Sequence, residues 1–183
     1  MVWVSGVRRD GAAAVLDLTG GRLRAISHWG TELGPWWAED VFALALAGVR
    51  TTDGNPVDVP VRLAILPQQE AGWTGRPGLS GHRMGGVDWS PHFVTTSVSV
   101  DGVAVPATTE PRLATGSVAV VTAEDRAAGL ELQIEIDLCA GGLLRSRASV
   151  TNVDATPYEL TELVLAYPVP SGARHLLDFA GPR

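Results

Sequence analysis

Nine consecutive residues, 130 to 138, alternate strictly between apolar and polar side chains. A period of two residues places the two kinds of side chain on opposite faces of a β-strand. One face should therefore pack on a core, and the other should hold solvated carboxylates. The apolar positions are Leu130, Leu132, Ile134, Ile136 and Leu138, and the polar ones are Glu131, Gln133, Glu135 and Asp137.

The residues that follow extend this strand into a predicted antiparallel meander. Residues 140–142, Ala-Gly-Gly, permit a tight reversal, and residues 143–150 return with Leu144, Ala148 and Val150 directed inward. Asn, Asp and Pro between 152 and 157 predict a second turn. We therefore expect residues 158–167 to form a third strand of the same sheet.

The rest of the chain reads as short strands separated by turns. Asp10-Gly11 is typical of a type I′ hairpin, and only residues 40–49 could form a helix. Turn-separated strands in 183 residues, 45% of them hydrophobic, predict an all-β fold, an antiparallel β-sandwich with little helix. The expected strands are 2–4, 13–18, 22–29 with Ile26 outward, 61–66, 93–100, 103–105, 117–122 and 175–179.

Charge and composition exclude several classes of partner. All fourteen basic residues are arginine, no basic run occurs, and the net charge is −6. Nucleic acid and anionic membranes are therefore not expected as partners, because both attract basic surfaces. The sequence shows no membrane-spanning stretch and no signal-peptide pattern. With the single Cys139, this predicts a cytoplasmic protein.

Between residues 67 and 92 the composition changes to Gly, Pro, Trp, His and Arg, without regular periodicity. An aperiodic run of this length inside a compact domain is more often a functional loop than a plain connection. We therefore expect any binding residues to lie in this run.

Several stretches, taken together in their order and spacing, resemble the N-terminal part of α-galactosidases of glycoside hydrolase family 36. The resemblance extends along nearly the whole chain. The stretches are residues 22–30 followed by Leu33, then 77–79 with 81–83 and 86–93, then 149–152, and finally 177–183.

The resemblance implies a β-supersandwich of galactose-mutarotase-like fold. In this family it precedes a catalytic (β/α)8 barrel and a small C-terminal β-domain. Residues 1–183 would then be a single β-sandwich domain, the first part of a larger N-terminal domain, without the barrel. Retaining glycoside hydrolysis needs two carboxyl groups about 5 Å apart, and in this family both belong to the barrel. We therefore expect no catalytic residue, no cofactor and no metal in this chain.

A supporting role in substrate binding is what the resemblance implies for the loop. In tetrameric family members a Gly-x-Asp-aromatic element of the N-terminal domain reaches a neighbouring active site, and residues 86–89 resemble it. Asp88 would accept sugar hydroxyls and Trp89 would stack on a pyranose. His82 and Arg83 are weaker candidates for ligand contact. The alternative is a turn aspartate beside a core tryptophan.

Other functions remain open at this stage. A free-standing carbohydrate-binding module would bind galactosides through Asp88, Trp89 or Trp36, whereas a purely structural domain would bind none. A sugar mutarotase would require a histidine and a carboxylate acting as acid and base, and no such pair is evident. His82, Asp88 and His92 are spaced too loosely to predict a zinc site. Unpaired edge strands would favour a homo-oligomer.

Overall fold

The computed structural model describes residues 4–21, 23, 25–34, 40, 43–44, 47, 63–106, 116–169 and 173–175. The described elements are two short 3-10 turns, η1 and η2, and strands β1 to β10. In chain order they are β1 (Val4–Arg9), β2 (Ala12–Asp17), η1 (Thr19–Gly21), β3 (Ile26–Thr31), β4 (Leu79–His82), β5 (Val94–Val100), β6 (Val103–Ala104), β7 (Val118–Asp125), β8 (Leu130–Leu138), η2 (Ala140–Gly142), β9 (Leu144–Asn152) and β10 (Glu159–Leu163).

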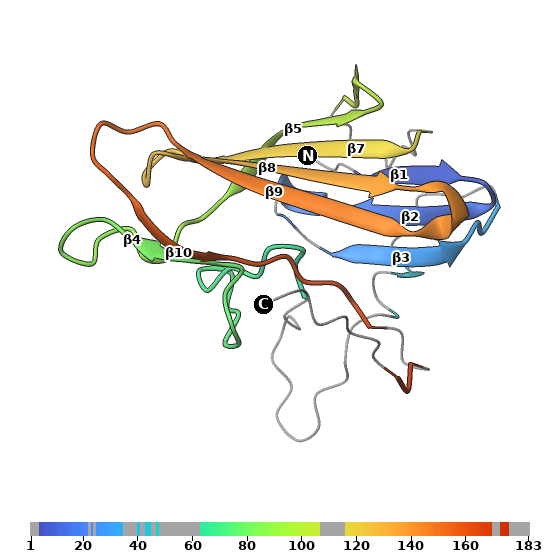
Figure 1. Cartoon of the computed structure of the whole chain (residues 1–183), viewed down its shortest axis with the longest axis horizontal. Helices are drawn as coiled ribbons and strands as arrows, with labels where there is room; N and C mark the ends of the chain where they lie inside the picture. Colours follow the sequence, from blue (N-terminus) through green and yellow to red (C-terminus); the bar gives the residue numbers. More distant parts are fainter. Residues whose placement is uncertain are drawn as a thin grey trace, which may run out of the picture.

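The strands form three antiparallel sheets. A five-stranded sheet has the order β6-β5-β7-β8-β9, a three-stranded sheet has the order β1-β2-β3, and β4 pairs with β10 (Figure 1). One hydrophobic cluster joins the two larger sheets, with Val7 and Leu16 from one and Val121 and Ile134 from the other. The predicted antiparallel β-sandwich is therefore confirmed. Among the described residues, no helix is long and apolar enough to cross a membrane.

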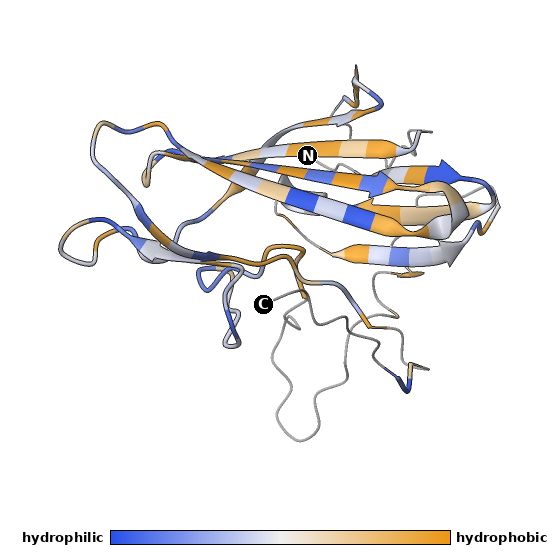
Figure 2. Ribbon diagram, in the orientation of Figure 1, coloured by the Kyte–Doolittle hydropathy of each residue, from blue (hydrophilic) through white to orange (hydrophobic). Residues whose placement is uncertain are grey.

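The alternating stretch forms β8, as predicted, and it lies at the centre of the core. Its five apolar side chains are almost completely buried, and β9 pairs with it along its whole length, from Leu130 opposite Asn152 to Leu138 opposite Leu144. Figure 2 shows the alternation of hydrophilic and hydrophobic residues along this hairpin. The period of two in the sequence therefore predicts correctly which face of β8 is buried.

The prediction of a fully solvated outer face is wrong for Asp137, which is buried. Arg145 lies directly opposite on β9, and its Nη2 donates to Asp137 Oδ2 over 2.5 Å. The hydrogen bond and the charge of Asp137 raise the pKa of the Arg145 guanidinium. Cross-strand pairing therefore covers a carboxylate that the alternation alone would leave in water.

The third strand of the predicted meander does not pair with β9. Instead, β10 pairs with β4, with Glu159 opposite His82 and Leu163 opposite Leu79. The connection between β9 and β10 is a hydrogen-bonded turn, in which Asn152 Nδ2 donates to the Thr156 carbonyl over 2.8 Å. The turn directs the chain away from its own hairpin and towards β4. Gly81 permits the close approach, because a Cβ there would lie 2.5 Å from the Glu159 carbonyl oxygen.

Other expected strands also differ from the structure. β3 begins at Ile26, and Ile26 is buried rather than outward, because the register with β2 shifts between Val15 and Leu16. Residues 63–66 of the expected strand 61–66 form no strand. Most of the expected helix 40–49, most of the strand 175–179, and Trp36 lie outside the described residues.

Two Asp-Gly pairs close tight hairpins. Asp10 and Gly11 have φ values of 50° and 77°, and Asp101 and Gly102 have values of 48° and 79°, as a type I′ turn requires. Asp101 also caps β7, because its carboxylate accepts the backbone N–H of Val118 over 2.9 Å and that of Ser117 over 3.1 Å. These two hydrogen bonds hold the pKa of Asp101 below its ordinary value.

We expect Ile134→Ala to lower the free energy of unfolding by roughly 2–5 kcal/mol, because a fully buried side chain would leave a cavity between the sheets. Urea denaturation followed by circular dichroism measures the change. Glu131→Ala on the exposed face of the same strand is the control and should cost much less. Equal losses for the two variants would contradict the assignment of faces.

We expect Asp101→Asn to lower stability mainly above about pH 4, the pKa of an unfolded Asp. A carboxyl whose folded pKa is depressed stabilises the protein above its unfolded pKa, and this contribution disappears as the pH falls through the folded pKa. Urea midpoints between acid and neutral pH should therefore converge for wild type and variant at low pH. Asp10→Asn is the control, because it makes the same substitution in the other Asp-Gly turn. A wild-type advantage that is constant with pH would contradict the proposed cap.

Candidate functional site

Part of the aperiodic run, residues 83–92, follows β4 and forms a loop that projects from one end of the molecule (Figure 1). We call this segment the Gly-rich loop. Its tip closes through two backbone hydrogen bonds, Arg83 N–H to the Val87 carbonyl at 2.7 Å and Gly86 N–H to the Arg83 carbonyl at 3.0 Å. Gly85 and Gly86 have φ values of 83° and 77°, which favour glycine over residues with a side chain. The tip is therefore a defined hairpin whose Met84 side chain is 95% exposed.

Arg83 lies at the base of this loop, and its side chain is only 8% exposed. Each of its five N–H groups has an acceptor. Nε donates to Asp88 Oδ2 at 3.1 Å, and Nη2 donates to the Ala128 carbonyl at 2.5 Å and to Asn152 Oδ1 at 2.9 Å. Nη1 donates to the Thr156 carbonyl and to Thr156 Oγ1. With all its donors engaged within the protein, Arg83 is suited to supporting the loop rather than to contacting a ligand.

Asp88 presents its carboxylate at the surface beside an open groove. The side chain is 25% exposed, and among the described residues its hydrogen bonds are to Arg83, at Oδ2. The groove has a volume of about 720 Å³ and runs from Asp88 past His92 to Glu124 and Arg126 at the end of β7. A carboxylate has about four lone-pair sites, so Asp88 keeps acceptor positions that Arg83 does not occupy. Asp88 can therefore accept hydrogen bonds from a polyol.

Trp89 is not a core residue, since 59% of its surface is exposed. It borders a shallow depression formed with Pro67, Pro77 and Pro91. An exposed indole is unusual on a surface and offers a flat apolar face to a ligand. Asp88 and Trp89 thus supply an acceptor and an aromatic face from consecutive positions of the same loop, the first at the groove and the second at the depression.

The two histidines of the loop differ in their surroundings. His82 is exposed, and its Nδ1 lies 2.9 Å from the Arg83 carbonyl oxygen, to which it donates. His92 Nδ1 lies 3.6 Å from Glu70 Oε1, a neighbour that the sequence alone did not reveal. Both side chains of that pair are well exposed to water. Within the described part of the chain, no three His, Cys, Asp or Glu residues are grouped to hold a metal ion.

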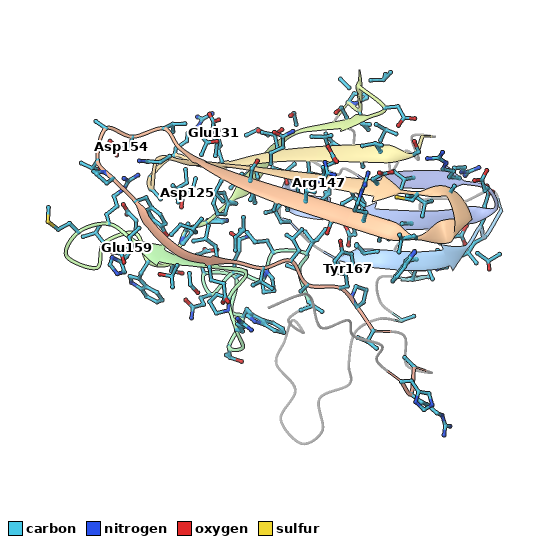
Figure 3. All side chains as sticks on the ribbon, in the orientation of Figure 1. Asp125, Glu131, Arg147, Asp154, Glu159 and Tyr167 are labelled. Carbon is cyan, nitrogen blue, oxygen red and sulfur yellow. The ribbon has the colours of Figure 1, made fainter. Side chains whose placement is uncertain are left out.

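Sequence reasoning missed the residues that support the loop. Asn152 was noted only in a predicted turn and in the family resemblance, and Thr156 only in that turn. Ala128 contributes a backbone carbonyl, which no side-chain pattern reveals. Asp125 was also missed. It fixes the far side of the loop by accepting the His92 N–H at 2.7 Å. Figure 3 shows Asp125, the last residue of β7, and Asp154, in the connection between β9 and β10, at the end of the molecule where the loop projects.

We expect Arg83→Lys to lower the free energy of unfolding by about 1–3 kcal/mol, because an ammonium cannot reach all of these acceptors and would leave buried carbonyls unsatisfied. Arg147→Lys is the matched control, since Arg147 is exposed and makes only a 3.8 Å ion pair with Glu135. Chemical denaturation of both variants measures the difference. If the two substitutions have the same effect, Arg83 does not support the loop as described.

Comparison with known proteins agrees with the resemblance noted in the sequence. Residues 22–182 match the model of the glycosyl hydrolase family 36 N-terminal domain. The chain is also 28% identical, over 156 residues, to an alpha-galactosidase of Escherichia coli. That match covers 85% of this chain and 19% of the relative, so the chain spans about a fifth of the relative's length. The chain therefore belongs to the glycosyl hydrolase family 36 N-terminal domains.

Proposed function

We propose that the chain is the non-catalytic N-terminal domain of an α-galactosidase and that its Asp88–Trp89 loop helps to bind the galactoside. The observation that carries the proposal is the loop itself, in which a carboxylate held by Arg83 is followed directly by an exposed indole. The family match and the relative's name, alpha-galactosidase, support the choice of sugar. His82 and Arg83 would serve at the edge and base of the same site.

The chemistry of the pair suits a hexose. A carboxylate can accept two hydroxyl groups, and an indole can cover the apolar face of a pyranose ring. The contact with Arg83 holds the Asp88 carboxylate in place, and a carboxylate accepts stronger hydrogen bonds from hydroxyl groups than a neutral oxygen does. The loop would contribute to affinity and orientation, whereas bond cleavage would belong to another domain.

Oligomerisation is a second part of the proposal. In the described region, β9 pairs with β8 on one side only. Unpaired strand edges recruit further strands from the same or another chain. We infer that the domain supports the catalytic barrel and takes part in a homo-oligomer, in which the projecting loop of one subunit can reach another. The reducing cytoplasm, which would keep Cys139 as a free thiol, is the proposed location.

Asp88→Asn should weaken binding of methyl α-D-galactopyranoside by roughly 10- to 100-fold, because hydrogen bonds to a charged group contribute about 1.5–3 kcal/mol. Trp89→Ala should weaken it as well. Two-dimensional NMR titration of the isotope-labelled chain measures both, with Asp10→Asn at the other end of the molecule as the control. Methyl α-D-mannopyranoside tests selectivity.

The possible outcomes separate the functional classes. Saturable shifts confined to residues 82–92 would support the loop as a sugar site. Tight binding by the chain alone would favour a free-standing carbohydrate-binding module. No shift for any sugar, with the loop intact, would contradict sugar binding by the loop on its own and would favour a purely structural domain.

A further inference from the structure

Asp88 has a left-handed backbone conformation that, unlike the other non-glycine cases in the described chain, is not part of an Asp-Gly turn. Three non-glycine residues of the described chain have positive φ: Asp10, Asp101 and Asp88, the last at 57°. Asp10 and Asp101 precede glycines in two-residue hairpin turns, where this conformation is expected. Asp88 instead precedes Trp89, next to the Arg83–Val87 bridge. Such a conformation persists only where surrounding contacts hold it.

Two side chains hold Asp88, one through its carboxylate and the other through its backbone carbonyl. Arg83 Nε donates to the carboxylate over 3.1 Å. The Tyr158 hydroxyl donates to the Asp88 backbone carbonyl over 3.2 Å. That carbonyl belongs to the peptide that joins Asp88 to Trp89, so it fixes the direction in which Trp89 leaves. The first contact therefore fixes the position of the Asp88 carboxylate, and the second fixes the direction of the backbone that carries the Trp89 indole.

Tyr158 is itself fixed in place. Its ring lies under the Arg83 guanidinium, 5.6 Å from ring centroid to Cζ, a distance typical of a cation–π contact. On another side it packs against Gly81, where a Cβ would lie 2.5 Å from Tyr158 Cε1. Burial and then the Asp88 charge raise the pKa of Tyr158, so the hydroxyl remains a donor well above neutral pH. The contact to Asp88 therefore persists throughout the working range of a cytoplasmic protein.

Both supports are anchored in the same distant segment, the connection between β9 and β10. Asn152 and Thr156 of this connection accept from Arg83, and Tyr158 lies two residues further on. We propose that Tyr158 is a positioning residue that, with Arg83, locks the left-handed backbone of Asp88 and so directs the Asp88 carboxylate and the Trp89 indole. The consequence for sugar binding rests on the proposed function of the loop, whereas the conformational lock does not.

Tyr158→Phe tests the lock, because it removes only the hydroxyl. We expect the Asp88 backbone shifts and its N–H to Hα coupling to move away from left-handed values, and the Trp89 indole resonance to broaden or shift. Tyr167→Phe is the matched control, since the Tyr167 hydroxyl is buried without a hydrogen-bond partner among the described residues. Unchanged Asp88 and Trp89 signals in Tyr158→Phe would overturn the proposal.

A rescue experiment separates the lock from a loss of general stability. Glycine adopts left-handed conformations freely, so in an Asp88→Gly background Tyr158→Phe should change the Trp89 resonance much less than in wild type. An equal change in both backgrounds would mean that Tyr158 acts on Trp89 without the Asp88 backbone, contradicting the proposal. If Tyr158→Phe prevents folding, the N–H to Hα coupling of Asp88 in the wild type decides. A coupling outside the left-handed range, or one averaged over several conformations, would reject a lock, and a single left-handed value would support it.

Galactoside titration of Tyr158→Phe adds the functional readout. If the loop binds sugar, the lock predicts at least several-fold weaker binding, with the control Tyr167→Phe unchanged. If wild type binds no sugar but Tyr158→Phe still alters the Asp88 signals, the proposed function fails and the lock stands. Binding that is unaffected by a demonstrated loss of the left-handed backbone would overturn the positioning role.

Discussion

The buried guanidinium of Arg83 is the interaction on which the functional end of this domain depends. It draws together the loop after β4, the turn between β7 and β8 at Ala128, and the connection between β9 and β10 at Asn152 and Thr156. Burial of a charged group is costly unless every donor is satisfied. Arg83 meets that condition with five acceptors. One side chain thereby converts three turns, distant in sequence, into a single fixed surface.

The fold explains why these turns meet. The sandwich core orders the β7–β8 and β8–β9 hairpins, whose register places the Ala128 turn beside the end of β9. The exit of β10 towards β4 then brings the turn after β9 against the loop that carries Asp88 and Trp89 (Figure 3). Had β10 continued the meander beside β9, Tyr158 could not have reached Asp88. The pairing of β10 with β4 instead of with β9 thus links the core to the exposed loop.

The sequence predicted what depends on local periodicity and local turn chemistry. The burial of β8, its hairpin with β9 and the Asp10-Gly11 turn all follow from spacings of a few residues. The partner of β10 and the burial of Asp137 do not, because each depends on a residue that arrives from another strand. The loop was identified from its composition, but the role of Arg83 was not. Two of its acceptors are backbone carbonyls, and these leave no trace in the identity of Ala128 or Thr156.

Hydrogen–deuterium exchange of the wild-type chain, read at single amides, tests most directly whether the loop is a fixed platform. The amides of Arg83, His92 and Phe93 all have acceptors, at the Val87 carbonyl, Asp125 Oδ2 and Gln68 Oε1. They should exchange far more slowly than an unstructured peptide, close to the amides of β8. If these three exchange at the rates of a free peptide while β8 remains protected, the loop is not held by Arg83 and its neighbours. In that case Asp88 and Trp89 do not form a preorganised site.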